Sequence, residues 1–103
     1  MNQPSNNIPK TVDEAVQGLV SDLPLKDKTT IANMAQSELP NLHLTLGGYI
    51  LNNFGILSGN WELMRSCRSE AKTTLQHDED AVGIIIEALW EKLQQTHKLR
   101  VVK

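Results

Sequence analysis

The sequence has a single cysteine, Cys67, and only four aromatic residues among its 103. One cysteine cannot form an internal disulfide and provides no thiol cluster for a metal ion. With so few aromatic side chains, the hydrophobic core has to be mainly aliphatic. No apolar run approaches the roughly 18 residues of a membrane-spanning helix, and the N-terminus does not resemble a signal peptide. These absences favour a small cytoplasmic protein, which we expect to be bacterial.

The chain also lacks a strong net charge. Its formal charge is −2 at pH 7, which argues against a nucleic-acid binder. Residues 1–10 are rich in Asn, Gln and Pro and are predicted to be a flexible arm. Residues 98–103 carry three cations and no acid, so they are predicted to be a basic tail. One helical domain is therefore predicted between them, over residues 11–97.

No segment alternates apolar and polar residues as a half-buried strand does, whereas apolar residues recur at three- and four-residue steps. The sequence therefore predicts a compact all-α bundle of about five helices. The first helix begins at a capping box of Thr11 and Glu14 and ends before Pro24. A second, shorter helix is predicted over residues 26–36. Its expected inward residues are Ile31, Met34 and Ala35.

The predicted centre of the bundle is an apolar helix over residues 40–54. Pro40 fits its first turn, Ser37 is its expected N-cap, and Gly55 is placed to end it in the left-handed conformation. Apolar residues lie around much of its circumference, so we expect neighbours on more than one side. They are Leu39, Leu42, Leu44, Leu46, Tyr49, Ile50, Leu51 and Phe54.

Gly47 and Gly48 lie inside this helix, where each costs about 1 kcal/mol relative to alanine. We expect another helix to cross closely at this pair, and a ligand that approaches the backbone is the alternative. The crossing helix is predicted over residues 78–95, with Asp78 as N-cap and Gly83 facing the glycine pair. Its apolar stripe is Ala81, Val82, Ile85, Ile86, Leu89, Trp90 and Leu93.

A fourth helix is predicted from Trp61 to about Ser69, with Asn60 as its N-cap. Trp61 is a candidate protein contact because tryptophan is enriched at binding hot spots. The pattern weakens over residues 70–76 and does not define a structure there.

Arg65, Arg68 and Lys72 follow one another at helical spacing and form a basic stripe. Such a stripe can contact phosphates, or it can be a solvated face paired with Glu62 and Glu70.

Three asparagines, Asn52, Asn53 and Asn60, gather around the end of the central helix. We interpret them as capping residues, and a polar pocket for a ligand amide or carboxylate is the alternative. The acids from Asp78 to Asp80 suit the positive end of a helix dipole, and no second ligand cluster lies at metal-binding spacing.

We therefore predict no metal and no cofactor. Cys67 with His43 or His77 would be a nucleophile and base, but the interpretation we favour is a buried structural thiol. His43 is expected to be partly buried.

Several of these stretches resemble a small family of uncharacterised bacterial helical domains. The resemblance rests on T-V-D-E-A-V at residues 11–16, G-x-x-I-x-N-x-F-G at 47–55, G-N at 59–60, and I-I-E-A-L-W-x-x-L at 85–93 after an acidic cap. It implies an all-α fold over residues 11–93 and no particular activity. The arginine that the family has after the isoleucine is Leu51 here, so any pair made by that arginine is lost.

These observations predict a non-enzymatic, cytoplasmic regulatory or interaction domain that binds another protein or a second copy of itself. Two alternatives remain open. One is a nucleic-acid-associated accessory domain that uses the basic stripe and the basic tail. The other is a small-ligand carrier with a pocket beside the central helix, near Gly48 and Asn52. No membrane partner is expected.

Overall fold

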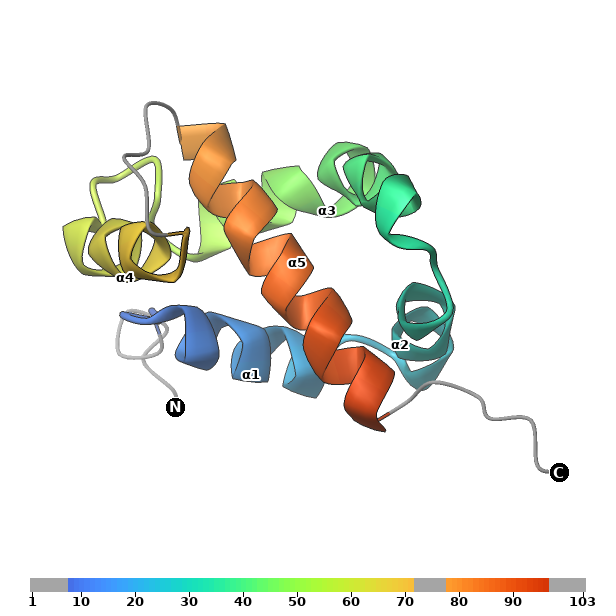
Figure 1. Cartoon of the computed structure of the whole chain (residues 1–103). Coiled ribbons are helices and arrows are strands. Elements are labelled where there is room, and N and C mark those ends of the chain that lie inside the picture. The colour runs from blue at the N-terminus through green and yellow to red at the C-terminus, as the bar shows by residue number, and fades with distance from the viewer. Residues whose placement is uncertain (1–7, 72–77, 97–103) are drawn as a thin grey trace, which may run out of the picture.

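The computed structural model describes residues 8–71 and 78–96, and within these ranges the chain is helical and has no strand (Figure 1). The elements are α1 (Val12–Asp22), α2 (Leu25–Ala32), the short 3₁₀ helix η2 (Gln36–Glu38), α3 (Leu39–Asn53), α4 (Trp61–Ala71) and α5 (Asp78–Thr96). The predicted all-α bundle of five helices is confirmed. None of these helices has the length and apolarity that crossing a membrane requires.

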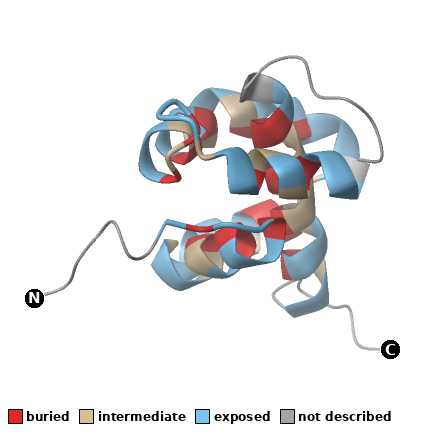
Figure 2. Ribbon diagram, turned by 90° about the vertical axis from the view of Figure 1, so that its left-hand side faces the viewer, coloured by how far each residue is buried: buried red, intermediate tan, exposed pale blue. Residues whose placement is uncertain are grey.

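Helix α5 packs against each of the other four α-helices and runs diagonally across them (Figure 1). Its apolar stripe lies where the sequence predicts it. The fully or almost fully buried members are Ala81, Val82, Ile85, Ile86, Leu89 and Leu93. Figure 2 shows buried residues on the sides of the helices that face one another and exposed residues on the outer sides. The core is therefore built on α5.

Helix α3 is crossed by α5, as predicted, but it is not enclosed. Leu44, on its outer side, is 86% exposed, and Tyr49 is 40% exposed. The expectation of neighbours on more than one side is therefore wrong for this part of α3. An apolar stretch can be wide because one face is buried and another is left in contact with solvent.

Of the two glycines of α3 predicted to lie at the helix crossing, only Gly47 does so. Gly47 is buried at the crossing, and a Cβ built there would lie 3.6 Å from both Val82 Cγ1 and His43 Cδ2, which is ordinary contact. Gly48 is exposed, and its Cβ would meet nothing within 4 Å. On α5, Gly83 faces the His43 ring, at 3.3 Å from a built Cβ to Cε1. A half-buried imidazole therefore lies between the two helices at Gly83.

The start of α1 has the predicted cap with one difference. The Thr11 hydroxyl accepts a hydrogen bond from the Glu14 backbone N–H at 3.1 Å. The Glu14 carboxylate accepts from the backbone N–H of Lys10 at 2.9 Å, whereas a capping box predicts the Thr11 N–H as that donor. The helix ends at Asp22, before Pro24, as predicted.

The second helix is shorter than predicted. It ends at Ala32, and Ala35, expected inside, is exposed. Two side-chain hydrogen bonds to backbone carbonyls lie at this end of α2. The Asn33 amide donates to the Thr29 carbonyl at 2.8 Å, and the Trp90 indole N–H donates to the Met34 carbonyl at 2.9 Å.

The N-cap of α3 also differs from the prediction. Ser37 lies inside η2, and Glu38 is the N-cap residue of α3. Pro40 does lie in the first turn, as predicted. The turn at η2 forms because the Glu38 carboxylate accepts from the Ala35 N–H at 2.8 Å.

Candidate functional site

The turn between α3 and α4 is shaped by two glycines in the left-handed region. Gly55 has φ +73° and Gly59 has φ +88°, a conformation that costs glycine little because it has no Cβ. The Asn60 N–H donates to the Gly55 carbonyl at 2.9 Å and closes the turn. Gly55 thus ends α3 as the sequence predicts.

Asn60 links three parts of the chain through its side chain. Its Oδ1 accepts from the Leu63 N–H at 3.3 Å, which makes it the predicted N-cap of α4. Its Nδ2 donates to the carbonyl of Pro9 at 2.7 Å and to that of Phe54 at 2.8 Å. Both amide protons are therefore used, and the start of α4 is tied to the end of α3 and to the segment before α1.

Trp61 follows this cap and is 61% exposed. The Arg65 guanidinium lies 5.7 Å from the centroid of its ring, within the range of a cation–π contact. A shallow groove of about 280 Å³ lies beside the tryptophan. It is lined by Ile8, Gly55, Ser58, Gly59, Asn60, Trp61 and Glu62. We call Trp61, Arg65 and this groove the Trp61 surface.

The basic stripe lies on α4 as expected from its spacing. Arg65 and Arg68 are both exposed, as are the acids Glu62 and Glu70 on the same helix. Lys72, the third member of the stripe, lies outside the described residues, as does most of the segment 70–76. Of the two described arginines, Arg65 is the one that lies over an aromatic ring, that of Trp61. The two arginines therefore have different surroundings.

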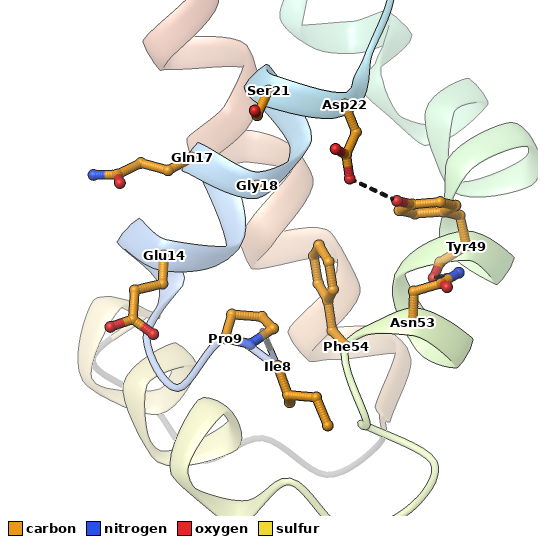
Figure 3. Close-up of a pocket in the computed structure, with 10 residues that line it drawn as sticks. All are labelled: Ile8, Pro9, Glu14, Gln17, Gly18, Ser21, Asp22, Tyr49, Asn53 and Phe54. Atoms are coloured by element: carbon orange, nitrogen blue, oxygen red, sulfur yellow. Dashed lines mark hydrogen bonds between the residues drawn. The ribbon is translucent and has the colours of Figure 1, made fainter. Parts of the chain in front are cut away.

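A larger cleft, of about 780 Å³, lies between α1 and the C-terminal part of α3 (Figure 3). Its lining residues are Ile8, Pro9, Glu14, Gln17, Gly18, Ser21, Asp22, Tyr49, Asn53 and Phe54. The Tyr49 hydroxyl donates to Asp22 Oδ2 at 3.0 Å across one end of the cleft. Burial and this bond to Asp22 raise the pKa of Tyr49. We call this site the α1–α3 cleft.

The predicted polar-pocket residues are distributed unevenly around this cleft. Asn53 lines it, and its amide donates to the Tyr49 carbonyl at 2.9 Å. Asn52 is exposed, and neither it nor Gly48 lines the cleft. Asn60 acts as a cap on the other side of the turn.

The acidic start of α5 lies apart from the cleft lining. Asp78, the predicted N-cap, is the first residue of α5. Asp80 is exposed in the first turn. Among the described residues, no group of three or more possible ligands could hold a metal ion.

One wall of the α1–α3 cleft comes from residues that the sequence analysis did not single out as a site. Glu14, Gln17, Gly18, Ser21 and Asp22 recur at three- and four-residue steps, so they share one face of α1. In the sequence, this face has the pattern of the solvent-exposed side of an amphipathic helix. The sequence does not indicate that α3 lies opposite it, so the cleft could not be predicted. The unusual member is Gly18, a glycine in the middle of a helix.

Cys67 is fully buried, and its thiol donates a weak hydrogen bond to the Ala81 carbonyl at 3.8 Å. Burial, with a smaller contribution from Glu70, raises the pKa of the thiol to about 11. Because the thiolate is the nucleophile, this cysteine is a poor one at neutral pH. His43 lies at the α3–α5 crossing beside Gly83.

The match to a known family covers most of the chain. Residues 8–93 match the family described as a domain of unknown function, DUF6794. The chain belongs to this family. The matched range begins at Ile8, which lines the α1–α3 cleft, and ends at Leu93, the last buried residue of α5. Neither the curated proteins nor the solved structures include a significant match to the chain.

Proposed function

We propose that this chain is a non-enzymatic protein-interaction domain of the bacterial cytoplasm and that it binds its partner through the Trp61 surface. The observation that carries the proposal is a tryptophan that is 61% exposed, directly after an N-cap whose side chain makes three hydrogen bonds. With only four aromatic residues in the chain, an exposed tryptophan leaves a large apolar side chain outside the core.

The fixed position of Trp61 favours binding. A side chain that is already ordered loses less conformational entropy when a partner covers it. The Asn60 side chain holds the backbone before the tryptophan, and Arg65 lies over its ring. Tryptophan and arginine are also the residue types most enriched among interface hot spots.

The surroundings of Trp61 indicate the chemistry of the partner. The groove beside it, about 280 Å³, has room for one apolar side chain. Arg65 and Arg68 are exposed on the same helix and can meet carboxylates. A partner suited to this surface therefore presents an apolar side chain next to an acidic one.

The test is capture of partners by photo-crosslinking to the tagged full-length chain, followed by calorimetry with each purified partner. We expect Trp61→Ala to weaken that binding by roughly thirtyfold, the effect of losing a hot spot worth about 2 kcal/mol. Arg65→Ala should weaken it less. The matched control is Leu44→Ala, which removes an apolar side chain that is 86% exposed on α3 and should leave the affinity unchanged.

Several results would contradict the proposal. One is a partner that binds Trp61→Ala and the unaltered chain equally, with circular dichroism showing both folded. Another is salt-sensitive binding to random duplex DNA without any protein partner, which would favour the nucleic-acid alternative. Sedimentation equilibrium of the unaltered chain and of Trp61→Ala measures their masses in solution. A dimer of the unaltered chain that Trp61→Ala does not form would mean that the partner is a second copy of this chain.

A further inference from the structure

We infer that the α1–α3 cleft binds a linear organic cation of the alkylammonium class, the chemistry shared by polyamines and lysine side chains. This inference concerns a site different from the Trp61 surface. Four observations support it: the shape of the cleft, the sign of its charges, the end of α3 that faces it, and the open space at Gly18.

The cleft is an elongated groove along α1. Its lining on this helix runs from Glu14 to Asp22, and the eight residue steps between them span about 12 Å at 1.5 Å per step. Figure 3 shows Pro9 and Phe54 between these two carboxylates. Pro9 is buried and Phe54 is 6% exposed, so they form a fixed apolar wall. A carboxylate at each end with an apolar wall between them fits a cation on a hydrocarbon stem.

The charged residues of the cleft are all acidic. Glu14 and Asp22 are its ionisable carboxylates, and no described lysine or arginine lines it. One oxygen of Glu14 accepts a hydrogen bond from the Lys10 N–H. One oxygen of Asp22 accepts from the Tyr49 hydroxyl. No described residue donates to the second oxygen of either carboxylate, so each can accept from an ammonium group.

The C-terminal end of α3 adds to the negative potential of the cleft. The C-terminal end of a helix carries a partial negative charge, which a nearby cation stabilises. Residues of the last turn of α1 (Ser21, Asp22) and of α3 (Asn53) line the cleft. Neither helix has a basic residue in its last turn. At the end of α1 the Lys28 ammonium already donates to the Val20 carbonyl at 3.0 Å. A bound ammonium group would therefore supply a cation at the end of α3.

Gly18 keeps the groove open. It lies in the middle of α1, where glycine is a poorer helix former than alanine. A Cβ built on it would meet nothing within 4 Å, so close packing inside the protein does not require a glycine there. Its position in the cleft lining means that any larger side chain would occupy ligand space.

The experiment is a titration of the full-length, ¹⁵N-labelled chain, followed by amide chemical shifts at constant ionic strength. The probes are spermidine and a blocked Lys-Gly-Lys peptide, with glutamate as an anionic control. We expect saturable shifts at Gln17, Gly18, Ser21 and Tyr49. If spermidine alone binds, the ligand is a free polyamine, and if the peptide binds as tightly, it is a lysine-bearing segment of another protein.

Variants locate the binding. Gly18→Leu places a side chain in the middle of the groove and should weaken binding by roughly tenfold or more, since a pocket must enclose most of its ligand. Glu14→Gln and Asp22→Asn should each weaken it by roughly 1.5- to 5-fold, the range of an exposed ion pair. Glu91→Gln removes the same charge from an exposed site on α5 and should have no effect.

Three results would overturn the inference: no saturable shift with either cation at millimolar concentration, equal shifts with glutamate, or undiminished binding by Gly18→Leu. Circular dichroism checks the fold of each variant. If Gly18→Leu does not fold, Gly18→Ala gives the same test with a smaller expected loss. Trp61→Ala should keep full affinity for the cation, which separates this site from the proposed protein contact.

Discussion

Replacing Asn60 with alanine removes three hydrogen bonds at once, and we expect it to destabilise the domain by about 3 kcal/mol. The lost N-cap of α4 accounts for about 1 kcal/mol. The two donations from Nδ2, to the carbonyls of Pro9 and Phe54, contribute about 1 kcal/mol each. The free energy of unfolding of a small domain is only about 5–15 kcal/mol in total, so the expected loss is large for one half-buried side chain.

Asn60→Asp separates the contribution of the N-cap from that of the two donated hydrogen bonds. Aspartate keeps the oxygen that accepts from the Leu63 N–H, and its charge suits the start of a helix. It has no donor for the two carbonyls and places a second oxygen near them. We therefore expect Asn60→Asp to lose about 2 kcal/mol, less than alanine, because the cap remains while the link to Pro9 and Phe54 is lost.

The assay is urea unfolding followed by circular dichroism at 222 nm, with linear extrapolation to water. Asn53→Ala is the control. It removes an exposed bond within α3 and should change stability by less than about 0.5 kcal/mol. The reasoning is refuted if Asn60→Asp is as stable as the unaltered chain, or if Asn60→Ala costs no more than Asn53→Ala.

Three further predictions concern single residues of the core and of α3. The Val12 N–H donates to Ser66 Oγ at 2.9 Å, so Ser66→Ala should cost about 1–2 kcal/mol in urea unfolding, whereas Ser69→Ala, at an exposed site, should cost almost nothing. Gly48→Ala should raise the stability by about 0.5–1 kcal/mol, because a Cβ there meets nothing within 4 Å; a loss measured by thermal melting would contradict the open space. Cys67, whose pKa is raised to about 11, should react with Ellman's reagent at neutral pH only as fast as the domain unfolds. Since the fold favours the neutral thiol, the stability that Cys67 contributes is complete below the ordinary pKa of about 8.5 and should fall as the pH rises toward about 11. An unfolding free energy that is equally pH-dependent in Cys67→Ala would contradict this.

Local signals in the sequence predict the ends of several helices well. Thr11 caps α1, Gly55 ends α3, and Asn60 caps α4, because each effect depends on backbone groups within a few residues. The stripe of α5 is equally clear, since a regular apolar spacing needs no knowledge of the partner helix. The exposure of Trp61 cannot be read in this way, because a tryptophan at a helix start suits either a core or a surface.

Contacts between distant residues decide the rest. The sequence by itself determined that the chain is an all-α bundle and where most of its helices begin and end. Only the tertiary structure decided that α2 stops at Ala32, beside the bond from Trp90 to Met34, and that α5 rather than α3 contacts every other helix. It also decided that the polar face of α1 lies opposite Tyr49 and forms a cleft. Helical periodicity shows which residues share a face, but what that face meets depends on how the helices cross.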